Sequence, residues 1–265
     1  DKFGTTIICK GIYSMVIWGD YHTHTIYSSG PHNAKHATGT ILENAMVAKE
    51  KGLKQIAITE HGFDHKLYGV KRKNINKMRR EIEEAKKKTG IDILLGIEAN
   101  FISSDGDVDL TEEDIKNLDF IIVGFHNFAK AKSLREFFKF RLPNMLNLRR
   151  KKDIRRNTLA VMKAMDKYPI DVISHPGAHM PIDFEAVGRH AIKTNTHLEL
   201  NGKRILYSKE DIKKLVEMGV KFMINSDAHS KDGVGEVNNG VNFMFKYDIP
   251  HSLVANIENF PNFKN

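Results

Sequence analysis

Histidine and carboxylate residues recur in short clusters along this chain of 265 residues. His22 and His24 are separated by a single residue, and Asp227 and His229 repeat that spacing far along the chain. In an extended segment, residues two positions apart point to the same side, so each pair can bind one ion together. Imidazole nitrogen and carboxylate oxygen are common ligands of zinc, manganese and iron, and the single cysteine, Cys9, excludes a site built from thiolates. The spacing therefore predicts a metal centre and leaves the identity of the ion open.

Short apolar runs rich in β-branched residues predict the strands that position these clusters. Seven such runs occupy residues 16–18, 55–59, 91–97, 120–123, 171–174, 197–200 and 221–225. Six of the runs are followed by, or end in, candidate ligands, namely His22, His24, Glu60, His61, Glu98, His126, His175, Asp227 and His229. A barrel collects the residues at the carboxyl ends of its strands on one rim, which is where its active site lies.

Amphipathic stretches alternate with these runs and predict helices near residues 40–51, 73–88, 111–117, 153–167, 183–193 and 208–218, with two more towards the C-terminus. Thr111 and Ser208 are predicted to cap two of them, because acidic residues follow each in the first turn. The alternation, without a Gly/Ser-rich linker, predicts one α/β barrel, and an open doubly wound sheet is the alternative. No dinucleotide fingerprint or P-loop follows the first run, so neither a nicotinamide cofactor nor NTP hydrolysis is indicated.

The net charge of +8 is concentrated in one segment. Residues 130–156 hold eleven Lys or Arg residues against Glu136 and Asp153, so the rest of the chain is close to neutral. This basic insertion, at about 127–156, is predicted to form a lid or wall on the active-site face. The preferred interpretation is a solvated basic face over a packed lid. The second is a lid that attracts anionic substrates, and the third is a docking site for nucleic acid or an acidic membrane.

Composition places the chain among globular proteins, with 41% hydrophobic and 28% charged residues. The apolar stretch at 5–18 is too short to cross a bilayer and lacks a signal-peptide cleavage pattern, so no integral membrane association is expected. One cysteine fits a reducing cytosol, and a cytoplasmic location is expected. Residues 1–14 are interpreted as an N-terminal extension or an artificial remnant, and residues 15–265 as a single barrel domain. The oligomeric state is not predicted.

Six motifs, taken together and in order, resemble the PHP (polymerase and histidinol phosphatase) superfamily, and within it the YcdX-like phosphatase branch. They are His-Thr-His-Thr at 22–25, Thr-Glu-His-Gly at 59–62, Gly-Ile-Glu-Ala-Asn at 96–100, Gly-Phe-His at 124–126, Ser-His-Pro-Gly at 174–177 and Ser-Asp-Ala-His at 226–229. The resemblance runs from about residue 16 to residue 245. It implies a distorted (β/α)7 barrel, similar to a TIM barrel, with a trinuclear metal site at the C-terminal ends of the strands.

The resemblance also implies how the ligands divide among three divalent transition-metal ions, with zinc preferred and manganese or iron as alternatives. One ion would take His22, His24, Glu98 and Asp227, a second Glu98, His126 and His175, and a third His36, His61 and His229. His32 is the alternative to His36, and the length of the following helix favours His36.

The activity expected from such a site is hydrolysis of a small phosphomonoester by a hydroxide that bridges the ions. Glu98 and Asp227 are the expected catalytic carboxylates, and Asp227 or a nearby histidine would manage the proton. Arg204 and Asn201 are predicted to hold the phosphoryl oxygens, with Lys231 a weaker candidate.

Three alternatives remain open at the level of sequence. One is a phosphatase specific for histidinol phosphate, and another is a DNA exonuclease of the PHP type, with nucleic acid as the partner. The third is a non-catalytic metal-binding module. The remaining histidines, namely His32, His65, His179, His190, His197 and His251, are interpreted as structural, although His32 and His179 lie close to ligand loops.

Overall fold

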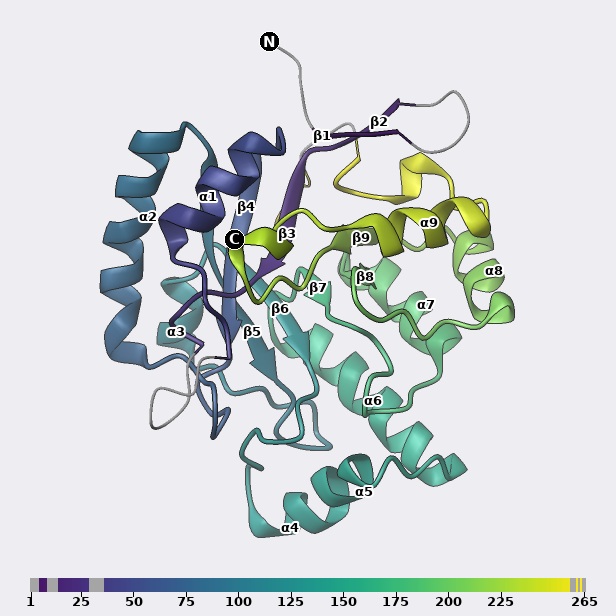
Figure 1. The fold of residues 1–265 in the computed structure, drawn as a ribbon. Helices are drawn as coiled ribbons and strands as arrows, with labels where there is room; N and C mark the ends of the chain where they lie inside the picture. The colour runs from purple at the N-terminus through teal and green to yellow at the C-terminus, as the bar shows by residue number, and fades with distance from the viewer. Residues whose placement is uncertain (1–4, 9–13, 29–35, 258–260, 262, 264–265) are drawn as a thin grey trace.

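Seven parallel strands form the centre of the computed structural model, which describes residues 5–8, 14–28, 36–257, 261 and 263. They pair in chain order, so that each strand lies beside the next. Their bounds are β3 (Gly19–Thr23), β4 (Gln55–His61), β5 (Asp92–Asn100), β6 (Phe120–Gly124), β7 (Val172–Ile173), β8 (His197–Asn201) and β9 (Phe222–Asn225). The predicted barrel class is confirmed, and helices cover the outside of the sheet (Figure 1).

The helices agree with the predicted amphipathic stretches to within a few residues. They are α1 (Ile41–Glu50), α2 (Ile75–Thr89), α3 (Glu112–Lys116), α6 (Lys151–Lys167), α7 (Phe184–Thr194), α8 (Lys209–Glu217) and α9 (Asn238–Lys246), with short 3₁₀ turns η2 (Arg72–Asn74), η4 (Lys231–Gly233) and η5 (His251–Leu253). Thr111 and Ser208 are the predicted caps, and each side chain accepts a hydrogen bond from the backbone N–H three residues on. Apolar residues on the inner faces of these helices pack on the strands in one continuous core.

The first predicted strand, residues 16–18, lies outside the barrel. Ser14–Ile17 (β2) instead pairs antiparallel with Thr5–Ile8 (β1), which places part of the expected N-terminal extension in a hairpin. The hairpin lies at the end of the barrel where the strands begin (Figure 1). The true first strand, β3, was missed because its buried residues include the polar Asp20 and His22. Burial of these polar side chains hides the apolar pattern by which strands are predicted.

The barrel closes between β3 and β9 through side chains. The backbones of these strands make only an isolated bridge in the described structure, between Thr23 and Ala228. Asn256, from the segment after α9, fills the remaining gap: its amide nitrogen donates to the carbonyls of Gly19 at 2.9 Å and Ile224 at 2.6 Å, and its oxygen accepts from the N–H of Ile224 at 3.1 Å. Asn256 is fully buried, so these bonds replace part of a missing backbone ladder.

The basic insertion follows β6 and contains a continuous helical segment. Its parts are α4 (Leu134–Glu136), a π-helical turn η3 (Phe137–Arg141) and α5 (Leu142–Met145). In Figure 1 this segment projects from the barrel at the end towards which β5 and β6 point. The candidate site residues follow the carboxyl ends of the strands, so the segment lies at the same end of the barrel as these residues.

Candidate metal centre

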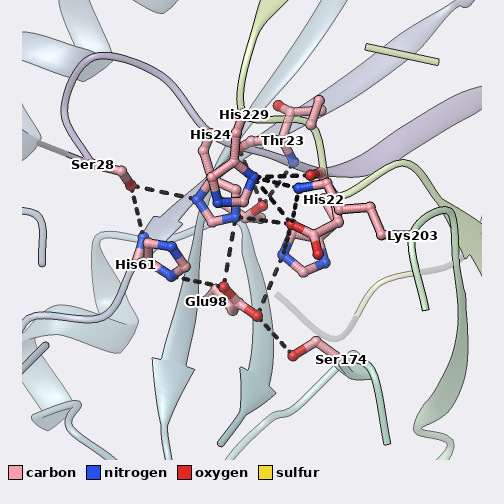
Figure 2. Close-up of polar contacts among 12 residues, drawn as sticks. His22, Thr23, His24, Ser28, His61, Glu98, Ser174, Lys203 and His229 are labelled. Atoms are coloured by element: carbon pink, nitrogen blue, oxygen red, sulfur yellow. Dashed lines mark hydrogen bonds and ion pairs between the residues drawn. The ribbon is translucent and has the colours of Figure 1, made fainter. Parts of the chain in front are cut away.

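Glu98, near the end of β5, lies at the centre of the candidate site. Its side chain is 1% exposed, and its carboxylate faces five imidazoles from four segments at the strand ends. Figure 2 shows Glu98 beside His22, His24 and His61. The shortest nitrogen–oxygen distances are 3.4 Å for His22, 3.6 Å for His24, 3.0 Å for His61, 3.3 Å for His126 and 2.9 Å for His175. One carboxylate shared among so many imidazoles is suited to bridge metal ions.

The other predicted ligands adjoin this cluster. Asp227 Oδ1 lies 3.7 Å from the Nε2 atoms of both His22 and His24. His36 Nε2 is 3.0 Å from His229 Nε2, so the structure brings His36 to the site. His32, the alternative loop residue, lies outside the described residues. All nine predicted ligands therefore gather in one cluster.

Three overlapping groups of these residues have ligand atoms within 4.8 Å of one another. They are His24, His61 and His229; His22, His24 and Asp227; and His61, Glu98 and His126. The groups differ in part from the predicted division, because His24 and His61 each belong to two of them. The overlap shows that these candidate ligands form one compact cluster.

Buried polar atoms in the cluster have no hydrogen-bond partner within the described part of the chain. They include Nε2 of His22, Nε2 of His24, both ring nitrogens of His61 and Oε2 of Glu98. Each buried polar atom left unpaired costs on the order of 1–3 kcal/mol. Nitrogen and oxygen lone pairs directed at a common space are what divalent ions bind, so the residues present fit a metal centre.

Burial keeps several of these imidazoles neutral, as metal binding requires. It lowers the pKa of His61 to about 3 and that of His36 to about 4. Glu98 behaves in the opposite way: burial alone would raise its pKa, but the neighbouring His126 and His22 bring the pKa well below its usual range. The site therefore offers an ionised Glu98 and neutral His61 and His36 near pH 7. Burial alone would lower the pKa of His22 as well, but the neighbouring Glu199 and Glu98 raise it well above its usual range.

Glu199, on β8, holds two of the ligands in place. Its fully buried carboxylate accepts hydrogen bonds from His22 Nδ1 at 2.8 Å and from the backbone N–H of His175 at 2.6 Å. The amides of Asn201 and Asn225 donate to the same carboxylate at 2.9 and 3.0 Å. A carboxylate on the far nitrogen of a ligating histidine fixes its tautomer and orientation. Sequence reasoning missed Glu199, although an acid inside a predicted buried strand was a signal.

Asn100 and Glu60 support the other side of the cluster. Asn100 Oδ1 lies 2.7 Å from His126 Nδ1, and its amide nitrogen donates to Asp109 at 2.6 Å. Glu60, predicted only as a polar residue of the rim, is fully buried and accepts hydrogen bonds from Thr25 and Ser28. Burial raises the pKa of Glu60 to about 7. These contacts show that the rim residues rest on a second layer of buried polar side chains.

A cavity of about 360 Å³ opens over the cluster. One part of its lining is aromatic, with Tyr68 stacked on His36 at 3.9 Å between ring centroids. The lining also includes polar residues, namely Asn201, Arg204, Lys203 and His179. Of the predicted phosphate-binding residues, Asn201 and Arg204 thus line the cavity.

Lys203 lines the cavity, where Lys231 was the predicted lysine. Lys203 Nζ lies 2.8 Å from His229 Nδ1 and 3.4 Å from Asp227 Oδ1. Lys231 does not line the cavity in the described structure, and its ammonium lies 3.5 Å from Glu43 instead. His65, predicted as structural, lines the cavity and stacks on His61 with ring centroids 5.1 Å apart. By contrast, His190 pairs with Asp166 at 2.7 Å on the helical exterior.

Two ligands have unusual backbone conformations. His175 has a φ of 28° and Asp227 a φ of 56°, values that residues other than glycine seldom adopt. Such conformations cost on the order of 1–3 kcal/mol and persist where the surrounding structure imposes them. For His175, the backbone N–H donates to the buried Glu199 carboxylate at 2.6 Å, which helps to hold this conformation.

A barrel with buried histidines and carboxylates at the carboxyl ends of its strands is the arrangement of a metal-dependent hydrolase. The family model described as the PHP domain matches residues 20–224, so the chain belongs to the PHP domain family. The resemblance found in the sequence motifs is confirmed.

Two relatives and one solved structure illustrate the similarity. A protein named "Probable phosphatase" from Caldanaerobacter subterraneus is 32% identical, with 93% of this chain and 90% of the relative covered. The "Probable phosphatase YcdX" of Escherichia coli is 30% identical, with 90% and 89% covered. The fold is similar to that of histidinol phosphate phosphatase from Lactococcus lactis, with a TM-score of 0.55 at 14% identity, covering 88% of this chain and 94% of that one.

Proposed function

We propose that the protein is a phosphatase that hydrolyses a small phosphomonoester at a centre of about three divalent ions, with zinc preferred. The position of Glu98 among five imidazoles carries this proposal, because a buried carboxylate with several imidazoles around it can be shared between neighbouring ions. The names of the relatives agree with it. The similar Lactococcus structure was solved with zinc, L-histidinol and phosphate, which supports the choice of ion.

The bound ions would activate a water molecule and neutralise charge on the phosphoryl group and the leaving group. The chain supplies the remaining donors. Lys203 and Arg204 offer positive charge at the cavity wall, and the Asn201 amide, which also bonds Asp227 at 3.3 Å, keeps that carboxylate in place. Asp227, whose side chain is 15% exposed, is the acid through which a proton can reach solvent.

The lining of the cavity narrows the class of substrate. Its volume suits a small molecule. Among the described lining residues, the only carboxylates are Glu98 and Asp227, which are assigned to the ions. An ammonium group on the substrate would therefore lack a partner, whereas Tyr68 and Phe128 can pack against a flat or apolar leaving group. We therefore favour neutral or anionic leaving groups over histidinol, which remains a candidate to be compared directly.

Phosphate release from a substrate panel tests this function. The panel contains sugar phosphates, nucleotides, aryl phosphates, histidinol phosphate, a phosphodiester and single-stranded DNA, each with and without a chelator. We expect turnover of monoesters that a chelator abolishes and added zinc or manganese restores. Turnover that persists in a fully chelated, metal-free sample would refute the metal-dependent mechanism.

A DNA exonuclease is the second candidate, and the basic insertion beside the cavity is the observation that favours it. The same panel separates the two functions. Release of nucleotides from single-stranded DNA without monoester turnover would replace the phosphatase proposal. The cytoplasm is the proposed location, because the sole cysteine fits a reducing compartment. Within the described helices, none combines the length and the apolar character needed to cross a membrane.

Replacement of Lys203 by alanine should lower kcat/KM for the preferred monoester about ten- to hundredfold, as expected for the loss of a charge-assisted hydrogen bond. Lys231→Ala is the matched control, because its ammonium faces Glu43 outside the cavity. We expect this control to stay within about twofold of the native enzyme. Equal losses in the two variants, measured by steady-state kinetics, would show that Lys203 does not contact the substrate.

A further inference from the structure

The helical segment of the basic insertion carries large apolar side chains on its outward side. Leu134 is 74% exposed, Phe138 60%, Met145 39% and Leu146 61%. A surface helix normally directs its apolar residues inward. Isolated exposed apolar residues are ordinary, but four within thirteen positions form a patch, and such patches mark interaction sites.

Three of these side chains recur at a near-helical spacing along the segment, and Leu146 follows directly after its end at Met145. Leu134 and Phe138 are four positions apart, and Met145 follows seven positions later, which corresponds to about one and two helical turns. The opposite side is buried and includes Phe140 and Arg141. The segment therefore has a buried inner side and also exposes apolar side chains on its outer side.

Arg141 fixes this orientation. Its buried guanidinium donates to the backbone carbonyls of His126 at 2.6 Å and Phe101 at 2.7 Å. Its centre also lies 4.9 Å from the ring centroid of Phe125. The segment is thus anchored to the end of β6 beside a candidate metal ligand, and its apolar side cannot turn inward without breaking these contacts.

Basic residues flank the patch in the sequence. Arg135, Arg149, Lys151, Lys152 and Arg155 are exposed, and none forms an ion pair with an acid in the described structure. The segment 130–156 has a net charge of +9, from eleven basic and two acidic residues. An apolar strip flanked by unpaired basic residues is the composition of helices that lie on anionic membranes.

The patch is continuous with the opening of the active site. Met145 and Phe128 line the same small cavity of about 130 Å³, and Phe128, which is 53% exposed, also lines the cavity over the metal centre. The helical segment projects from the end of the barrel where the candidate ligands gather (Figure 1). A planar partner that covers the patch would therefore face the mouth of the active site.

We propose that this surface, formed by Leu134, Phe138, Met145 and Leu146 with the basic residues around them, docks the enzyme on an anionic phospholipid membrane. Apolar insertion and electrostatic attraction act together, which is what stable but reversible attachment requires. A second copy of the chain fits less well, because two segments of +9 charge would repel each other. Nucleic acid also fits less well, because Phe138 is the only one of these four residues with a ring on which a base can stack.

Co-sedimentation of the full chain with vesicles tests the proposal. The vesicles contain phosphatidylglycerol mixed with phosphatidylcholine, or phosphatidylcholine alone, and the double variant Leu134→Ser/Phe138→Ser is compared with the native chain. Leu159→Ser/Ile192→Ser is the matched control, because these residues are 42% and 46% exposed on α6 and α7. We expect native binding only to the anionic vesicles, weakened by salt, and at least a roughly tenfold lower partition coefficient for the insertion variant.

The control variant should bind like the native chain, and both variants should retain native phosphatase activity on a soluble monoester, since none of the four residues lines the active-site cavity. Activity on the soluble substrate reports the proposed function separately from membrane binding. Absence of binding to anionic vesicles, or equal binding by the native chain and the insertion variant, would overturn the docking proposal. Tight binding of single-stranded RNA that the insertion variant retains, without vesicle binding, would replace it with a nucleic-acid surface.

Discussion

Replacement of Glu98 by alanine should lower kcat/KM for phosphomonoester hydrolysis about a thousandfold or more and should lower the amount of bound metal. Glu98 is the side chain that faces His22, His24, His61, His126 and His175 together. Metal ions supply several kcal/mol of charge stabilisation in such reactions, and each 1.4 kcal/mol corresponds to about a factor of ten in rate. Loss of this carboxylate would therefore remove a ligand from the two ion positions to which Glu98 is assigned. Metal content measured by mass spectrometry, beside steady-state kinetics, checks both expectations.

Glu217→Ala provides the matched control for this variant. Its side chain is 63% exposed on α8 and pairs only with Lys213, at 3.9 Å. The control should keep native activity and native metal content, and circular dichroism should show that both variants are folded. A folded Glu98→Ala enzyme with native metal content and native turnover would contradict the role assigned to this carboxylate.

Glu199→Gln should lower activity and metal affinity about ten- to hundredfold, although Glu199 is not a predicted ligand. Four donors point at its carboxylate, from His22, His175, Asn201 and Asn225. A glutamine side chain keeps one acceptor oxygen and turns an NH₂ group towards two of these donors. The orientation of His22 and the turn that carries His175 should both be disturbed.

Titration with zinc distinguishes this effect from general unfolding. Because the loss arises from poorly oriented ligands, excess zinc should restore part of the activity of Glu199→Gln. Glu210→Gln, at an exposed position of α8, is the control and should behave as the native chain. A loss that excess zinc leaves unchanged, in a variant with a native melting temperature, would show that Glu199 acts otherwise than by orienting ligands.

The metal ligands could be predicted from the sequence because their signal is local. His22 with His24, and Asp227 with His229, lie two positions apart, and the other predicted ligands except His36, which the family resemblance supplied, follow apolar runs or end them. In an extended segment that spacing sets the direction of the side chains, whereas Asp227 has a φ of 56° and is not extended. The placement of nine residues in one cluster then follows from the rule that parallel strands end on one rim.

The residues that support the ligands could not be predicted in this way. Glu199 reaches His22 across 177 positions of sequence, and Asn100 reaches His126 across 26. Such contacts depend on which strands are neighbours and on the register between them, and neither is encoded in a local pattern. Lys203 and Lys231 show the same limit. Lys203 lies two residues after Asn201, and Lys231 lies four residues after Asp227, so both follow a site residue closely. Only the path of each loop decides which lysine reaches the cavity.

The junction between β3 and β9, called the seam here, affects the order in which the site assembles. His22 and His24 stand on one side of the seam and Asp227 and His229 follow the strand on the other, so these ligands meet only when it closes. Asn256, which completes it, bonds to Gly19 across 237 positions, and contacts of such long range form late because their loop-closure entropy is large. We therefore expect a nascent chain to assemble the full ligand set only after residue 256 has left the ribosome. A fragment that ends before β9 lacks Asp227 and His229 and so lacks part of that set.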